Sequence, residues 1–341
     1  IIAAVRGGMD ARRTRKGGAA RRPGRRTFVL ENLIVSVNVV FPLFALMAVG
    51  FLLNRIGLLD GHTAEKMNTV TFKAFLPVLI FYNIYRTDVG EIFDARLVLL
   101  ALALVALLFL VLWLLVPRLE KDYRRRGVLI QGMFRSNFIL YGLPVTASLF
   151  GEENTGTAAM LVAFVVPLYN VLSVIILEWY ASRQINIKKI AKGIATNPLI
   201  LGAICGGLFL LLGVRMPQAL EDAVQDLSGL ATPMAFLVLG ASFRFSSLAG
   251  NWKALVCAVV VKLAVVPAML LPVCVAFGYR SLALAALLTM LGAPTAVSSY
   301  TMARQLDADS ELAGQIVVFT SVCSILTMFF WVFLLRQLAL L

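Results

Sequence analysis

Residues 97–116, LVLLALALVALLFLVLWLLV, are twenty consecutive apolar residues in which only the Trp113 indole can form a hydrogen bond. At ~1.5 Å per residue, a helix of this length matches a hydrocarbon core of ~30 Å. Of the 341 residues, 60% are hydrophobic and 14% are charged, and the mean hydropathy is +0.88. A soluble or fibrous fold cannot cover so much apolar surface, so we predict an all-α polytopic membrane protein.

Nine further apolar stretches lie on either side of this segment, separated by short polar loops. The sequence therefore predicts ten transmembrane helices, at about 33–54, 67–85, 95–117, 128–150, 157–180, 194–213, 229–245, 253–277, 281–304 and 311–335.

The net charge of +13 is concentrated in residues 1–29, which hold nine of the 31 basic residues and one acid. Aromatic residues are not interleaved with these arginines, so we expect no nucleic-acid partner. Two interpretations of this basic tail stay open. It is a basic arm that contacts anionic lipid, or it is an upstream segment that does not belong to the native protein.

Lys and Arg in the remaining loops indicate the orientation of the chain. If both termini lie outside, the inner loops carry fourteen basic residues and the outer loops with the C-terminus carry five. The positive-inside rule therefore places both termini outside, provided that residues 1–29 are set aside. We interpret Arg135 and Arg304, which lie near the inner face, as part of this topology signal.

The chain also contains an internal repeat. Leucine matches between apolar spans arise by chance, so we consider only the scarcer Pro and Gly. At a spacing of 156 residues, Pro42, Gly50, Gly57 and Pro77 coincide with Pro198, Gly206, Gly213 and Pro233. Each copy has five spans, and this odd number inverts the second copy. We predict two inverted five-helix repeats, 30–180 and 194–341, joined by a cytoplasmic loop at 181–193, as is typical of secondary transporters.

Spans four and nine each contain Gly-x-Pro in mid-segment, where the spacing falls to 150: Gly142-Leu143-Pro144 and Gly292-Ala293-Pro294. Proline removes a backbone donor and glycine permits non-helical geometry, so we expect both helices to break there. A break in hydrocarbon must face protein or a water-filled cavity, so the breaks predict a shared site.

The second half-helices would begin near 145–148 and 295–298, where N-terminal amides attract an anion. Thr146, Thr295, Ser298 and Ser299 add hydroxyl groups, and the carbonyl ends near Tyr141 and Leu291 suit a cation. In the alternative interpretation, Gly-Pro only kinks each helix and the hydroxyls bond to their own backbone.

Few other residues have side chains that could bind a substrate, hold a metal or act in catalysis. Lys262 lies too deep in its span to reach the surface easily. It either balances a substrate carboxylate or switches protonation, or else it snorkels or pairs with a backbone carbonyl. With a single histidine, His62, and four isolated cysteines, we expect no metal site, no cofactor and no enzymatic activity.

Several motifs resemble the auxin efflux carrier family over residues 30–341: FLPVLIFYNI at 75–84, RSN at 135–137 before GLP at 142–144, VPLYN at 166–170 and APTAV at 293–297. This family includes the plant PIN-FORMED exporters and bacterial carriers assigned to malate or malonate. The resemblance implies ten spans in two inverted repeats, crossed spans four and nine, and homodimers. It also implies that Asn137, seven residues before Pro144, and Lys262, five before Pro267, serve the substrate. Leu199 replaces an asparagine of the plant pattern, which argues against auxin.

We therefore expect a multi-pass secondary carrier of the bacterial inner membrane, which moves a small organic anion such as a mono- or dicarboxylate by alternating access. A proton or a sodium ion would be the coupling ion. The alternatives are an uncoupled anion channel or uniporter, and a membrane sensor on a transporter scaffold. The predicted substrate site comprises Asn137, Gly142, Pro144, Thr146, Lys262, Gly292, Pro294, Thr295 and Ser298.

Overall fold

The computed structural model describes residues 41–86, 93–151, 154–181, 191–193, 195–244 and 248–341, and within these ranges the regular structure is helical throughout. Six of the described helices are long and apolar enough to cross a membrane: Gly61–Tyr85, Ala95–Leu119, Gly156–Tyr180, Gln218–Ser242, Gly250–Ala276 and Ser310–Gln337. Phe41–Arg55, Pro198–Leu211 and Ser281–Gly292 are shorter apolar helices.

The helix α4 (Ala95–Leu119) shows why these segments suit a bilayer. One of its faces is buried in the protein through Leu97, Ala101 and Val105. The opposite face leaves Leu99 66% and Leu114 65% exposed. An apolar surface of this kind is unfavourable in water, and lipid chains cover it without cost.

Two of the long helices contain a π-helical turn directly before a proline. Gly61–Tyr85 comprises α2 (Gly61–Val70), η1 (Thr71–Phe75) and α3 (Leu76–Tyr85), with Pro77 after the wide turn. Gly250–Ala276 lies within α11 (Leu248–Val260), η4 (Val261–Val265) and α12 (Val266–Ala276), with Pro267 in the same place. The wider turn gives the proline ring room and lets the helix continue.

Two of the predicted spans, 128–150 and 281–304, are each interrupted by a short non-helical stretch. The first break, Arg135 to Asn137, separates α5 (Tyr123–Phe134) from α6 (Phe138–Phe150). The second break, Ala293 to Val297, separates α13 (Ser281–Gly292) from α14 (Ser298–Gln305). The second lies where the Gly-x-Pro motif predicts it.

The expected break at Gly142-Leu143-Pro144 is wrong, because Pro144 lies inside α6 and the chain leaves helical geometry seven residues earlier. A membrane helix tolerates proline when its neighbours satisfy the freed backbone groups. The Asn137 backbone amide, at the end of this break, has its partner at Pro294 in the other break, which the sequence motif does not show. The position of the break is therefore decided by the crossing of the two spans.

At this crossing, the broken ends supply each other with hydrogen-bond partners. The Asn137 amide donates to the Pro294 carbonyl across 2.7 Å. The Thr295 hydroxyl donates to the Gly132 carbonyl across 2.6 Å, which caps the C-terminal end of α5. The Ser136 hydroxyl donates to the Met290 carbonyl near the C-terminal end of α13. Each break thus supplies hydrogen-bond partners for the polar groups of the other, in an interior where water cannot do so.

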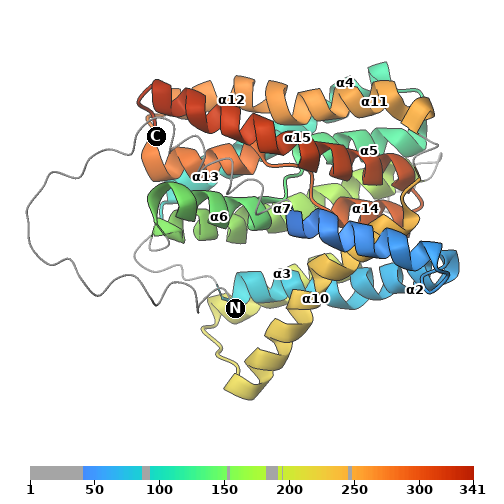
Figure 1. Cartoon of the computed structure of the whole chain (residues 1–341). Coiled ribbons are helices and arrows are strands. Elements are labelled where there is room, and N and C mark those ends of the chain that lie inside the picture. The colour runs from blue at the N-terminus through green and yellow to red at the C-terminus, as the bar shows by residue number, and fades with distance from the viewer. Residues whose placement is uncertain (1–40, 87–92, 152–153, 182–190, 194, 245–247) are drawn as a thin grey trace, which may run out of the picture.

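Most helices run roughly parallel to one another, and α10 (Gln218–Ser242) crosses them obliquely (Figure 1). The helices α4, α5, α6, α7 (Gly156–Ala181), α11, α12, α13, α14 and α15 (Ser310–Gln337) pack together around the two breaks. We call this set the crossover group. The scaffold group comprises Phe41–Arg55, α2, α3, α9 (Pro198–Leu211) and α10, in which α3 packs on both α9 and α10.

Glycines allow close packing inside the scaffold group. Gly50 lies against the Leu237 backbone of α10, and Gly206 of α9 lies against the Phe81 backbone of α3. Gly50 and Gly206 are 156 residues apart, as are Phe81 and Leu237. The same spacing therefore relates both members of the two contacts.

We expect Gly206→Ala and Gly207→Ala to have opposite effects on stability. A Cβ at Gly206 would lie 2.8 Å from the Phe81 carbonyl oxygen, whereas a Cβ at Gly207 meets nothing within 4 Å. Alanine in place of glycine stabilises a helix by ~0.5–1 kcal/mol, but overpacking costs ~1–3 kcal/mol. In detergent, Gly206→Ala should lower the Tm and Gly207→Ala should keep or raise it. Equal Tm values would contradict this close packing.

Candidate functional site

A cavity of about 400 Å³ lies where the crossover group meets the scaffold group. Its wall is mostly aliphatic and comes from Phe41–Arg55, α3, α6, α7, α9, α10 and the two breaks. Against this apolar background stand a few polar side chains: Arg135, Ser136, Asn137, Tyr169, Asn170, Ser228, Thr232 and Ser298. A mainly apolar cavity with a few converging polar groups is typical of a small-molecule site.

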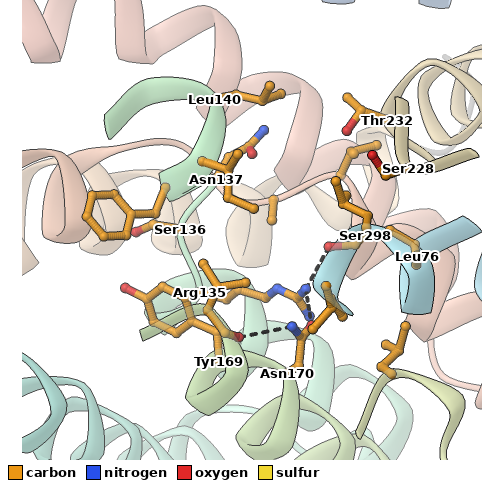
Figure 2. A pocket seen from close by; sticks show the side chains of 18 of the residues that line it. Leu76, Arg135, Ser136, Asn137, Leu140, Tyr169, Asn170, Ser228, Thr232 and Ser298 are labelled. Carbon is orange, nitrogen blue, oxygen red and sulfur yellow. Dashed lines mark hydrogen bonds between the residues drawn. The ribbon is translucent and has the colours of Figure 1, made fainter. Parts of the chain in front are cut away.

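Arg135 is the cation of this cavity (Figure 2). It follows the last residue of α5, and only 4% of its surface is exposed. Its Nη2 donates to Asn170 Oδ1 across 2.6 Å and to Ser298 Oγ across 2.7 Å, while Nη1 contacts the Met302 sulfur. Among the described residues, no carboxylate forms an ion pair with Arg135. The guanidinium therefore faces the cavity with its charge uncompensated.

Asn137 lies beside Arg135 at the start of α6. Its backbone carries the crossing bond to Pro294, but its side chain does not cap the helix. Its Nδ2 is buried, and among the described residues it has no hydrogen-bond partner. Residues 138–140, which form the first turn of α6, also line the cavity. A free amide donor and a helix N-terminus both favour an anion at this point.

The scaffold group supplies the facing wall through α10. Ser228 and Thr232 lie one helical turn apart there, and Figure 2 shows them across the space from Asn137. The Ser228 hydroxyl donates to the Gln225 carbonyl across 2.7 Å, so its oxygen remains free to accept. The cavity thus has its cation on the crossover group and hydroxyl groups on the scaffold group.

Lys262 lies behind this cavity and does not line it. It is fully buried in η4, where its Nζ donates to Ser136 Oγ and, across 3.2 Å, to the Leu291 carbonyl. Ser136 lines the cavity, so one hydroxyl separates the ammonium group from the space.

The remaining predicted site residues do not line the cavity. Thr146 donates to the Gly142 carbonyl of its own helix across 2.7 Å, as the alternative interpretation predicts for a kinked span. Gly292 ends α13, Pro294 accepts the Asn137 amide, and Thr295 caps α5. Of the nine predicted residues, Asn137 and Ser298 line the cavity.

Sequence reasoning missed Arg135, Asn170 and the two hydroxyls on α10. Arg135 carries a signal, because an ionisable residue within a predicted span is by default a functional candidate. Its position near one end of the predicted span suggested topology instead. Asn170, Ser228 and Thr232 have no such signal, since single polar residues in apolar helices commonly bond to their own backbone.

We expect Thr295→Val to destabilise the protein and Thr146→Val to be nearly neutral. Valine at 295 leaves the Gly132 carbonyl at the end of α5 without its hydroxyl donor, which costs ~1–3 kcal/mol for a buried group. Valine at 146 also removes a hydroxyl donor, but its acceptor, the Gly142 carbonyl, lies within a helix. Thermal unfolding in detergent compares the two, and an equal loss of stability in both variants would contradict the capping role of Thr295.

Comparison with known proteins gives a family and three relatives. A family model described as "Membrane transport protein" matches residues 35–332. An uncharacterized transporter of Methanothermobacter thermautotrophicus is 23% identical over 87% of this chain and 97% of its own length. An uncharacterized transporter of Methanocaldococcus jannaschii is 22% identical over 87% of this chain and 98% of its own length. A putative malonate transporter of Rhizobium meliloti is 23% identical over 88% of this chain and 96% of its own length.

The family match covers most of the chain, and each of these relatives is covered almost from end to end. The apolar helices and the buried crossing are those of a multi-pass membrane protein. The chain therefore belongs to the auxin efflux carrier family of membrane transport proteins, and it is a transporter rather than an enzyme.

Proposed function

We propose that this protein is a secondary active carrier that binds a small organic anion in the cavity beside Arg135 and moves it by alternating access. The observation that carries this proposal is the buried guanidinium, which faces the cavity without an acidic partner among the described residues. A buried charge is costly unless it is paired, so a carboxylate that enters the cavity completes an otherwise unfavourable site.

The neighbouring groups fit a carboxylate. With its Nη2 already bonded, the Arg135 guanidinium would attract a carboxylate through its charge and its remaining N–H groups, and the unpartnered Nδ2 of Asn137 adds a further donor. Asn170 and Ser298 hold the guanidinium in place through its Nη2. The N-terminal turn of α6 adds a favourable dipole.

The cavity wall narrows the substrate class. Arg135 is the single basic side chain among the described residues that line the cavity, and most of the other lining residues are aliphatic. We therefore expect one carboxylate of the substrate to be bound tightly. The rest of the substrate would pack against the apolar wall and contact the hydroxyls of Ser228 and Thr232. Monocarboxylates and short dicarboxylates both meet this description, and one relative is named a putative malonate transporter.

The two helix groups suggest how the carrier works. The cavity lies between them, with its charge on one group and the hydroxyls of Ser228 and Thr232 on the other. A shift of the crossover group relative to the scaffold group would expose the anion to one side of the membrane and then to the other. The two broken spans form the moving part in this proposal, because Arg135 and Ser298 both adjoin the breaks.

Two inverted repeats of five spans underlie this architecture in our proposal. The 156-residue spacing supports it, since it relates the contact of Gly50 with Leu237 to that of Gly206 with Phe81. The orientation with both termini outside a bacterial inner membrane rests on the loop charges. Arg124 donates to the Asp307 carbonyl across 2.8 Å, so two of the predicted inner loops lie at the same end of the molecule. The homodimer rests on the family resemblance.

Reconstitution into proteoliposomes tests the proposal directly. We expect saturable uptake of malonate or of a monocarboxylate such as benzoate, and accelerated exchange when unlabelled substrate is preloaded. A carrier shows this counterflow because its site changes sides with or without cargo, whereas an open channel does not. Linear flux without counterflow would favour the channel, and binding without flux would favour the sensor.

We expect Arg135→Gln to abolish this uptake and Arg280→Gln to retain it. Glutamine at 135 keeps polar contacts with Asn170 and Ser298 but removes the charge that the anion needs. Arg280 is an exposed arginine that bonds to the Val275 and Tyr279 carbonyls, away from the cavity. Uptake by Arg135→Gln at the wild-type rate would exclude Arg135 as the anion site.

Asn137→Ala should weaken substrate binding without unfolding the protein. The substitution removes an unpartnered donor from the cavity and leaves the backbone bond to Pro294 in place. Loss of one hydrogen bond to a charged group corresponds to ~1.5–3 kcal/mol, or about a tenfold or larger rise in apparent KM. Thermal unfolding serves as the control, and unchanged uptake would remove Asn137 from the site.

A further inference from the structure

The C-terminal end of α13 is a cluster of carbonyl groups inside the protein. The Met290 carbonyl accepts from the Tyr169 hydroxyl across 3.0 Å and from the Ser136 hydroxyl. The Leu291 carbonyl is the neighbouring acceptor, and it points to Lys262. Unpaired carbonyls and the negative end of the helix dipole make such an end a natural site for a cation.

Carriers built from inverted repeats commonly bind a coupling sodium ion at carbonyl groups of this kind. Sodium is a hard cation and prefers hydroxyl and carbonyl oxygens. Ser136 Oγ and the Leu291 carbonyl are such oxygens, and both are already bonded to the Lys262 ammonium group. The cation at the C-terminal end of α13 is thus the protein's own Lys262 ammonium group.

The surroundings of Lys262 fit this role. Its side chain has no exposed surface, and no described carboxylate forms an ion pair with it. It lies in the π-helical turn η4, a deformation that is frequent at functional positions. Its two acceptors come from the first break and from α13, so one ammonium group joins both broken spans.

We propose that the Lys262 ammonium group is a tethered substitute for a coupling sodium ion, and that its removal opens a sodium site at Ser136 and the α13 carbonyls. The inference rests on the proposed carrier function and names its ion dependence. A tethered cation holds the crossing permanently in the state that sodium would otherwise induce. The wild-type carrier therefore binds its anion without sodium and draws no energy from a sodium gradient.

Sodium binding to purified protein in detergent tests this site without any carboxylate. Lys262→Ala removes the ammonium group and leaves space for an ion with its water, whereas Lys262→Met is a matched control that fills the same space with an apolar chain. We expect saturable binding of radioactive sodium to Lys262→Ala and none to the wild type or to Lys262→Met. Saturable binding to the wild type, or its absence in a folded Lys262→Ala, would overturn the proposal.

Carboxylate affinity gives a second readout, with malonate and benzoate as probes. Replacing sodium with choline should leave the wild-type affinity unchanged. In Lys262→Ala, sodium should tighten the affinity roughly tenfold, within the usual range of coupling between two sites. Lys262→Met should bind the carboxylates weakly both in sodium and in choline. Lys262→Ala with wild-type affinity in choline would overturn the proposal.

The two proposals fail in different ways. A wild type that binds no carboxylate and shows no counterflow would refute the carrier, while the sodium measurement would still report on the Lys262 site. Sodium-dependent counterflow by the wild type would confirm a carrier and overturn the tethered cation. Because this last measurement uses the wild type, it can overturn the proposal even if Lys262→Ala does not fold.

Discussion

The hydrogen bonds between two helix breaks hold this structure together at its centre. An interrupted helix in an apolar bundle exposes amide and carbonyl groups that no water can satisfy. Here the Asn137 backbone amide donates to the Pro294 carbonyl, and the Gly132 carbonyl accepts from the Thr295 hydroxyl. Neither break is favourable without the other, so the two breaks lie side by side in the interior.

The crossing also sets the electrostatics of the cavity. Two buried cations, Arg135 and Lys262, lie at the C-terminal ends of α5 and α13, and the described residues give neither of them an acidic partner. Lys262 is separated from the cavity by the Ser136 hydroxyl, whereas Arg135 lines the cavity directly. The different roles that we propose for the two cations follow from this difference in access.

The Gly-x-Pro motifs show where sequence reasoning succeeds and fails. The motif at Gly292 predicts its break correctly, since Ala293 to Val297 is not helical. The similar motif at Gly142 lies inside α6. Proline lowers the cost of a break but does not require one, and the cost is decided by partners elsewhere in the fold. A spacing of 150 between the motifs thus aligned residues with different roles.

The sequence by itself determined an all-helical membrane protein, because apolar runs such as residues 97–116 can be covered only by lipid. It also indicated the family, two interrupted spans, and Asn137 and Ser298 as residues of the cavity. Only the tertiary structure decided that the first break lies at Arg135, and that Arg135 faces the cavity while Lys262 lies behind it. Those positions depend on hydrogen bonds between residues more than 120 positions apart, which no local pattern encodes.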